Sequence, residues 1–227
     1  MKEVEIDERE GKPSASGAPR WVPCTASFKF EAAMPDENKA CLRRGLKIHY
    51  AMERSDLSFL SYSDAICAER LMYHEGRLVD KYGLEGAEVI KEKRFWHSDR
   101  SFSARIDSIH MTKEVALVIN YKTGFYEQEK IDKDWQCAAE ASVVWTNLKP
   151  KRVIIAKIHP NYDPGYQAKV CDMDTLGRAT ERLNASALLA MSEDAEFNPG
   201  PAQCQWCLGK KYGTCWAYQE WSEEHGS

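Results

Sequence analysis

Apolar side chains recur at helical spacing in four segments of the chain and at strand spacing in four others. The expected helices are 38–56, 61–82, 131–147 and 172–194. The expected strands are 87–97, 102–110, 114–122 and 152–159. The first helix places Ile48, Ala51 and Met52 on one face, whereas residues 115–119 form a nearly continuous apolar run, as is typical of a central strand. The order of these elements predicts an α/β fold with a mixed central sheet flanked by helices.

The beginning of the chain lacks such a pattern. Residues 1–19 are rich in charge, Ser, Gly and Pro, a composition typical of a disordered leader. We expect order to begin near Trp21 and residues 20–227 to form a single domain, since a chain of 227 residues is long enough to bury a sizeable core.

Net charge limits the class of partner. The formal net charge is -4, so a nucleic-acid partner would need a local basic groove. Three basic sets could line such a groove or lie on solvated faces: Arg43–Arg44–Lys47, Lys91–Lys93–Arg94 and Lys149–Lys151–Arg152.

The chain contains eight cysteines, and the cellular compartment decides whether they are expected to form disulfides or to bind a metal. No apolar run reaches the length of a membrane span, and the acidic N-terminus lacks the apolar core of a signal peptide. These features predict a cytoplasmic protein, in which stable disulfides are rare. Metal binding is then the leading explanation for the cysteines.

Cys204, Cys207 and Cys215 form a C-x₂-C-x₇-C pattern near the C-terminus. Structural zinc and cubane iron–sulfur clusters both normally need four protein ligands, so a fourth must come from elsewhere. Cys24 follows a proline where the ordered chain begins, and the two ends of a domain often lie close together. The other cysteines are weaker candidates: Cys67 and Cys137 fit buried positions in helices, and Cys41 and Cys171 are ambiguous. Spacing leaves zinc and iron–sulfur both open, although nearby aromatic residues suit a cluster slightly better.

A second group of polar residues lies on the predicted hairpin. Asp107 is on one strand, and Asn120 and Lys122 share a face of the next. A turn at 111–114 would bring Asp107 close to Asn120. With a carboxylate at position 120 this arrangement would bind a divalent cation, and Lys122 could orient a water for attack on a phosphodiester. The alternative is a solvated hairpin edge, which the apolar neighbours of Asp107 and Asn120 disfavour.

These residues resemble the RecB-like branch of the PD-(D/E)XK nuclease superfamily. The matching segments are RID at 105–107 and NYKTG at 120–124, with Asn where the family has Asp. His49 fits the family's His on an earlier helix, and Gln136 fits its Gln on the following helix. A four-cysteine subset has one Cys before the core and three after it, holding a [4Fe-4S] cluster, and the four cysteines match that order. The segment PSAS…RWVPC…PDE also resembles the N-terminus of phage-encoded members.

The resemblance implies a PD-(D/E)XK core with a terminal iron–sulfur clamp formed by Cys24, Cys204, Cys207 and Cys215. It implies that His49, Asp107, position 120 and the carbonyl of Tyr121 hold Mg²⁺ or Mn²⁺. Lys122 would position the attacking water, and Gln136 would steady the substrate or Lys122. The implied activity is a metal-dependent DNA exonuclease, acting chiefly on single strands or DNA ends. A homo-oligomer or a recombination or repair partner would be compatible with it.

Two departures from the family pattern qualify this interpretation. Asn120 is neutral and binds a hard cation more weakly than Asp, which predicts an inactive chain, either by engineered Asp→Asn substitution or by natural degeneration. Glu140 stands where the family more often has Tyr, which puts the DNA-facing role of that helix in doubt. A catalytically silent DNA- or protein-binding module and a zinc-stapled α/β protein are therefore the competing hypotheses.

The remaining candidates carry less weight. His74, His97, His110 and His159 are expected to be surface or packing residues. Glu92 could add an acidic group near the metal, and Phe95, Trp96 and Phe102 fit the core better than a base-stacking role.

Overall fold

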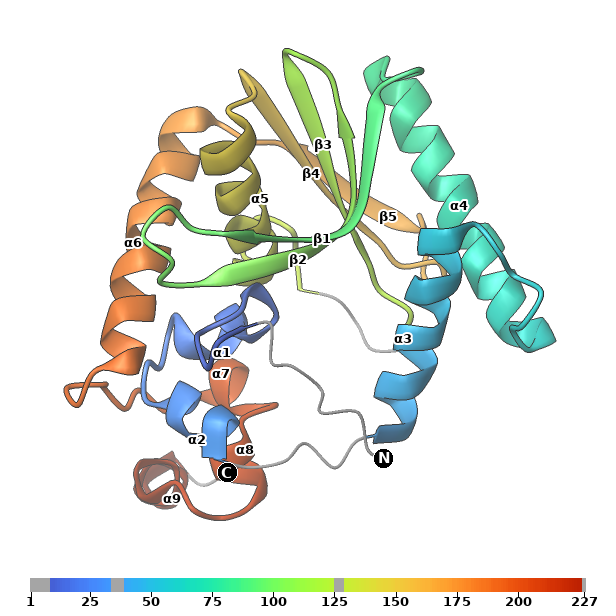
Figure 1. Cartoon of the computed structure of the whole chain (residues 1–227). Helices are drawn as coiled ribbons and strands as arrows, with labels where there is room; N and C mark the ends of the chain where they lie inside the picture. The colour runs from blue at the N-terminus through green and yellow to red at the C-terminus, as the bar shows by residue number, and fades with distance from the viewer. Residues whose placement is uncertain (1–8, 34–38, 125–128, 226–227) are drawn as a thin grey trace.

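A five-stranded sheet in the order β1-β2-β3-β4-β5 forms the centre of the fold (Figure 1). The computed structural model describes residues 9–33, 39–124 and 129–225. The strands are β1 Glu88–Trp96, β2 Ser103–Met111, β3 Val115–Tyr121, β4 Arg152–Ile158 and β5 Tyr166–Val170. β3 and β4 are parallel and the other neighbours are antiparallel, so the prediction of a mixed sheet is confirmed.

Alternating side chains of β3 and β4 divide the core into two layers. Ala116 and Val118 of β3 pack on one face of the sheet, whereas Leu117 and Ile119 pack on the other. β4 alternates in the same way, because successive side chains of a strand point to opposite faces. Both faces of the central strands are therefore covered, which explains their continuous apolar sequence.

Two pairs of helices cover the two faces (Figure 1). α5 (Trp135–Leu148) and α6 (Met173–Met191) lie on one side, and α3 (Lys39–Arg54) and α4 (Tyr62–Tyr82) on the other. Each matches a predicted helix, although α5 begins at Trp135 and not at 131, because Asp134 caps it by accepting from the backbone N–H groups of Gln136 and Cys137.

Strand β5 was not predicted from the sequence. It reads YQAKV and is only half-buried along most of its length, since it forms the edge of the sheet. Its weak alternation carries no strand signal, and pairing with β4 supplies its structure.

The expected disordered leader is ordered where the structure describes it. Ser14 forms a parallel bridge with Ser103, and the carbonyl of Pro13 accepts from the Ser103 N–H. The 3₁₀ turn η1 (Ala15–Gly17) and helix α1 (Ala18–Trp21) follow, with Ala15 and Ala18 buried. Order therefore begins before Trp21, because this segment buries small side chains against the core; residues 1–8 lie outside the described part of the chain.

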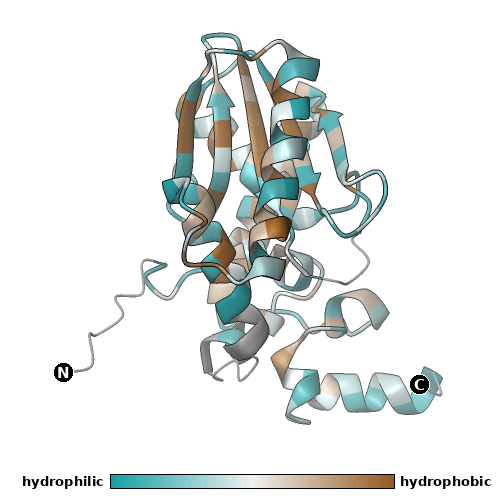
Figure 2. Cartoon of the chain, turned by 90° about the vertical axis from the view of Figure 1, so that its right-hand side faces the viewer, coloured by the Kyte–Doolittle hydropathy of each residue, from teal (hydrophilic) through white to brown (hydrophobic). Residues whose placement is uncertain are grey.

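Short helices at both ends of the chain meet below the sheet (Figure 1). They are α2 (Ser27–Ala33), α7 (Pro201–Cys204), α8 (Leu208–Lys211) and α9 (Trp216–His225). The Ala26 N–H donates to the carbonyl of Glu196, and Thr25 Oγ1 accepts from the Glu196 N–H at 2.8 Å. Figure 2 shows apolar residues concentrated in the strands, while α9 extends sideways with a largely hydrophilic surface. Among the described helices, none is both long and apolar enough to cross a membrane.

Candidate functional site

Polar residues from both sides of the sheet meet in a cavity of about 920 Å³. The cavity is bounded by α3, by β1, β2 and β3, and by the first turns of α5. The predicted site residues that line it are His49, Asp107, Asn120, Tyr121, Lys122 and Gln136. The fold thus brings together every predicted residue of the hairpin constellation, although their chemical roles stay predictions.

His49, Glu92 and Asp107 form the tightest group in the cavity. One ligand atom from each lies within 4.8 Å of the other two. His49 Nδ1 is 3.2 Å from Glu92 Oε1 and 3.2 Å from Asp107 Oδ1. Two carboxylates and an imidazole are a donor set that suits a divalent cation such as Mg²⁺ or Mn²⁺.

Backbone conformation makes Glu92 part of this group. The β1–β2 ladder runs in one register on both sides of Glu92 and Asp107 but is interrupted at these two residues. Glu92 has φ 49°, a left-handed conformation that is rare for residues other than Gly. Such outliers concentrate at functional sites, where the surrounding structure holds them in place. Glu92 is only a minor candidate in the sequence, because nothing in its local pattern indicates this backbone conformation.

The predicted hairpin geometry holds Asp107 beside the next strand. Ser108 pairs with Ile119, so Asp107 faces the Asn120–Tyr121 peptide. Asp107 Oδ2 accepts a hydrogen bond from the Tyr121 N–H at 2.7 Å. This bond fixes one carboxylate oxygen and leaves the other toward His49.

A chain of hydrogen bonds links Lys122 to Asn120 through α5. Lys122 Nζ donates to Gln136 Oε1 at 2.8 Å, and Gln136 Nε2 donates to Glu140 Oε1 at 2.8 Å. Asn120 Nδ2 donates to the same oxygen of Glu140 at 2.5 Å. Glu140, which appeared in the sequence only as a departure from a motif, therefore lies in the middle of the site.

The pKa values of Glu140 and His49, which both line the cavity, are raised for different reasons. Burial raises the pKa of Glu140 to about 8, with the Asp107 charge adding to the effect and Lys122 opposing it. Burial alone would lower the pKa of His49, but the neighbouring Asp107 and Glu92 carboxylates raise it to about 10.

A second layer of polar residues supports the site from behind. Glu75 on α4 accepts from Ser108 and His110 through Oε1 and from the Tyr121 hydroxyl through Oε2, at 2.7–2.8 Å. Burial would raise the pKa of Glu75, but these hydrogen bonds bring it below its usual value. The prediction that His110 packs structurally agrees with this contact, whereas no local pattern singled out Glu75.

The four predicted cluster cysteines, Cys24, Cys204, Cys207 and Cys215, are all buried and free. Two backbone N–H groups approach their sulfurs: Asn198 at 3.4 Å from Cys24 Sγ, and Gly200 at 3.4 Å from Cys204 Sγ. The thiols are not gathered at one point, however, since His49, Glu92 and Asp107 are the only such ligand group within 4.8 Å among the described residues. Thiolates on one tetrahedral zinc would lie about 3.8 Å apart, given Zn–S distances of about 2.3 Å. The compact zinc site of the alternative hypothesis is therefore not formed by these residues.

The other cysteines follow the expectation for buried side chains. Cys67 and Cys137 each pack in one of the two core layers. Cys171 is partly buried beside α6, and the side chain of Cys41 lies outside the described part of the structure.

Comparison with known proteins finds one matching family model and several similar solved structures. A family model described as the PD-(D/E)XK nuclease superfamily matches residues 23–212. Comparison with curated proteins gives no significant match. A solved structure named "Putative exonuclease", from Eubacterium rectale, is similar with TM-score 0.55 and 13% identity, covering 93% of this chain and 92% of that one. An alkaline exonuclease (LHK-Exo) from Laribacter hongkongensis gives TM-score 0.42 and 11% identity, covering 82% of this chain and 91% of that one.

Proposed function

The chain belongs to the PD-(D/E)XK nuclease superfamily, and from that premise we propose that it is a metal-dependent DNA exonuclease acting on single strands or DNA ends. The observation that carries the proposal is the group formed by His49, Glu92 and Asp107, with Lys122 lining the same cavity. Glu92 and Asp107 are partly buried carboxylates that share one imidazole, and Arg105 pairs with Oε2 of Glu92, at 2.9 Å. A cation between the two acids would offset their mutual repulsion. The donor set therefore fits Mg²⁺ or Mn²⁺.

His49, Glu92 and Asp107 would hold the cation, together with the Tyr121 carbonyl and a group at position 120. When bound, the cation polarises the phosphodiester and stabilises the charge that develops on it. Lys122 keeps donor capacity beyond its bond to Gln136, because an ammonium group has three N–H donors. It can thus orient a water for in-line attack, while Gln136 fixes the position of the Lys122 side chain.

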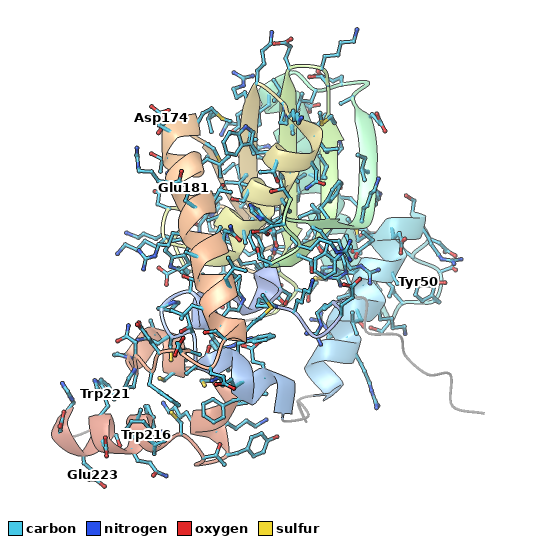
Figure 3. The ribbon with its side chains drawn as sticks, turned by 60° about the vertical axis from the view of Figure 1, so that its left-hand side comes forward. Tyr50, Asp174, Glu181, Trp216, Trp221 and Glu223 are labelled. Atoms are coloured by element: carbon cyan, nitrogen blue, oxygen red, sulfur yellow. The ribbon has the colours of Figure 1, made fainter. Side chains whose placement is uncertain are left out.

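The mouth of the cavity supports DNA as the substrate. Lys47, Arg94 and Arg105 line the cavity and supply positive charge for a phosphate backbone, although Arg105 also pairs with Glu92 at 2.9 Å. Tyr50 also lines the cavity, is 45% exposed and projects outward from α3 (Figure 3). An exposed ring beside basic residues is suited to stacking a base of a single strand. We also propose a cytoplasmic location, where a DNA substrate would be available.

The test is cleavage of end-labelled linear DNA, single- and double-stranded, beside closed circular DNA, with Mn²⁺ or Mg²⁺. We expect linear DNA to be degraded and circular DNA to survive. Asp107→Asn should abolish cleavage, whereas Asp174→Asn on the exposed start of α6 should not change it (Figure 3). Absence of cleavage on every substrate would contradict the nuclease proposal, and rapid cleavage of circles would contradict the exonuclease part of it.

Asn120 favours one competing function, a silent DNA-binding module. Such a protein would bind DNA without cutting it, because the site lacks the motif's second acid. In that case Asn120→Asp should create nuclease activity that the unmodified chain lacks.

We further propose that Cys24, Cys204, Cys207 and Cys215 hold a [4Fe-4S] cluster that clamps the two ends of the chain. All four thiols are buried and two of them receive backbone N–H groups, which supports this assignment. Each cysteine of a cubane binds a different iron, so these thiols need not converge as closely as zinc ligands.

Anaerobically purified protein should then show the visible absorption of an iron–sulfur cluster. Cys24→Ala should lose the colour and lower the melting temperature, because metal binding couples to folding. Cys67→Ala is the matched control, because Cys67 is a buried free cysteine in α4 and not one of the four assigned ligands, so this variant should keep the colour. Colour retained at full stoichiometry in Cys24→Ala would contradict the ligand assignment.

A further inference from the structure

We propose that Glu140 supplies the carboxylate that this site lacks at position 120, so that Asn120 and Glu140 together replace the acidic residue of the motif. The inference deepens the proposed function and rests on it, because it assigns an additional ligand to the same divalent cation. It concerns two residues that the sequence presented as separate departures from the family pattern.

Two amide donors fix the orientation of Glu140. Its side chain lies one helical turn after Gln136 on α5 and is 2% exposed. Asn120 Nδ2, at 2.5 Å, and Gln136 Nε2, at 2.8 Å, both donate to Oε1. A carboxylate held by two donors on one oxygen cannot rotate freely, so its other oxygen has a fixed position.

Within the described part of the chain, the second carboxylate oxygen of Glu140, Oε2, lacks the partner that a buried carboxylate oxygen normally has. Glu140 Oε2 is buried and has no hydrogen-bond partner among the residues that the structure describes. Buried carboxylate oxygens are almost always paired, because an unpaired one loses its hydration without compensation. Glu140 lines the same cavity as Glu92 and Asp107, although it lies outside their 4.8 Å group in the metal-free structure. A cation drawn toward Glu140 would give this oxygen the partner that the described residues do not provide.

An amide at position 120 is compatible with the neighbouring Glu140 carboxylate, whereas a second carboxylate there is not. An Asp at position 120 would place a carboxylate oxygen where the amide now donates to Glu140 Oε1, and two adjacent carboxylates repel each other. An amide in the same place donates a hydrogen bond and carries no charge. The number of acids around the cavity is preserved, since Glu92, Asp107 and Glu140 replace an arrangement of Glu92, Asp107 and an acid at 120. The acid of the motif has thus moved from position 120 to position 140, and Asn120 does not indicate that the metal site is lost.

Calorimetric titration of Mn²⁺ into the metal-free full-length protein tests this inference without relying on activity. We expect Glu140→Gln to weaken Mn²⁺ binding roughly tenfold or more, because a buried charged ligand is lost while the shape is kept. The exchange variant Asn120→Asp/Glu140→Gln should restore binding to within about threefold of the unmodified chain, because it returns the acid to position 120. Glu31→Gln, which removes an acid of α2 that pairs with Arg20 of α1, is the matched control and should not change binding.

The outcomes separate this inference from the proposed function. Unchanged Mn²⁺ affinity in Glu140→Gln, with binding lost in Asp107→Asn, would overturn the role of Glu140 and leave the metal site intact. Failure of the exchange variant to recover binding, while thermal unfolding shows that it folds, would also overturn the inference. Absence of Mn²⁺ binding by the unmodified chain would overturn both.

Discussion

His49 is held between two carboxylates, and this position ties its ionisation to the stability of the metal-free protein. Its Nδ1 lies 3.2 Å from both Glu92 and Asp107. Despite burial, which acts in the opposite direction, these acids raise its pKa from 6.5 to about 10. The folded state therefore binds this proton more tightly than the unfolded state does. The resulting stabilisation is fully present below pH 6.5 and is lost as the pH rises through 10.

Urea unfolding in EDTA should reveal this contribution at the residue scale. We expect His49→Asn to be less stable than the unmodified chain at pH 6, by roughly 2–4 kcal/mol. At about 1.4 kcal/mol per pKa unit the shift corresponds to about 5 kcal/mol, and solvent screening of the partly exposed side chain reduces this value. The difference should shrink steadily as the pH approaches 10.

His74 provides a control, because its protonation should change the stability of the fold in the opposite direction. Burial lowers its pKa, assisted by the charges of Arg77 and Arg70, so its protonation on acidification destabilises the fold. His74→Asn should therefore gain relative stability as the pH falls through 6.5. A His49→Asn difference that does not depend on pH would contradict the ion-pair interpretation.

Helix α5 is the element on which the site depends, since it carries both Gln136 and Glu140. Its start is fixed by Asp134, which caps the helix and accepts from Lys157 Nζ at 2.7 Å. Lys157 is fully buried on β4, so this ion pair attaches the first turn of the helix to the sheet. Burial would raise the pKa of Asp134, but the Lys157 charge and hydrogen bond lower it.

Removing one partner of this buried ion pair should destabilise the attachment of α5 to the sheet and lower the free energy of unfolding. We expect Lys157→Met to reduce the free energy of unfolding by about 3–5 kcal/mol, because Asp134 is left buried without its countercharge. Lys169→Met on the neighbouring strand β5 is the matched control. Lys169 pairs with Asp132, but both side chains are substantially exposed, so a loss below about 1 kcal/mol is expected in urea unfolding. Equal losses in the two variants would show that burial of the pair does not matter.

At the scale of the whole molecule, charge is distributed unevenly. The chain carries a formal net charge of -4, yet Lys47, Arg94 and Arg105 line the cavity. Of the basic sets found in the sequence, the one around Lys149–Lys151–Arg152 does not line it, and Lys151 instead pairs with Glu114 at 2.9 Å. DNA binding should therefore depend on the few basic residues that line the cavity.

The salt dependence of DNA affinity measures this distribution. Lys47→Gln should reduce the slope of log K against log salt for a single-stranded oligonucleotide by about 0.7, as expected when one phosphate contact is lost. Lys151→Gln should leave the slope unchanged. Equal effects of the two variants would indicate non-specific attraction by surface charge in place of a defined groove. Fluorescence anisotropy at several salt concentrations, with Ca²⁺ replacing Mn²⁺ to prevent cleavage, provides the measurement.

The amino-acid sequence determined the features that depend on local order. Periodicity placed the long helices and the first four strands, because alternation along β3 and β4 directly reflects which face of the sheet each side chain meets. The proximity of Asp107 to Asn120 was also predictable, since a short hairpin turn fixes the register of its two strands.

The tertiary structure decided the features that join distant segments. The bond between Asn120 and Glu140 exists because α5 packs against β3, and no spacing in the sequence encodes that contact. Glu92 joins the site through a left-handed backbone conformation, and the N-terminal segment becomes ordered only by pairing with Ser103. Periodicity reports which side of an element is buried, but only packing brings particular atoms within hydrogen-bonding distance. For that reason the sequence identified the family motif, whereas the fold revealed which acids surround the cavity.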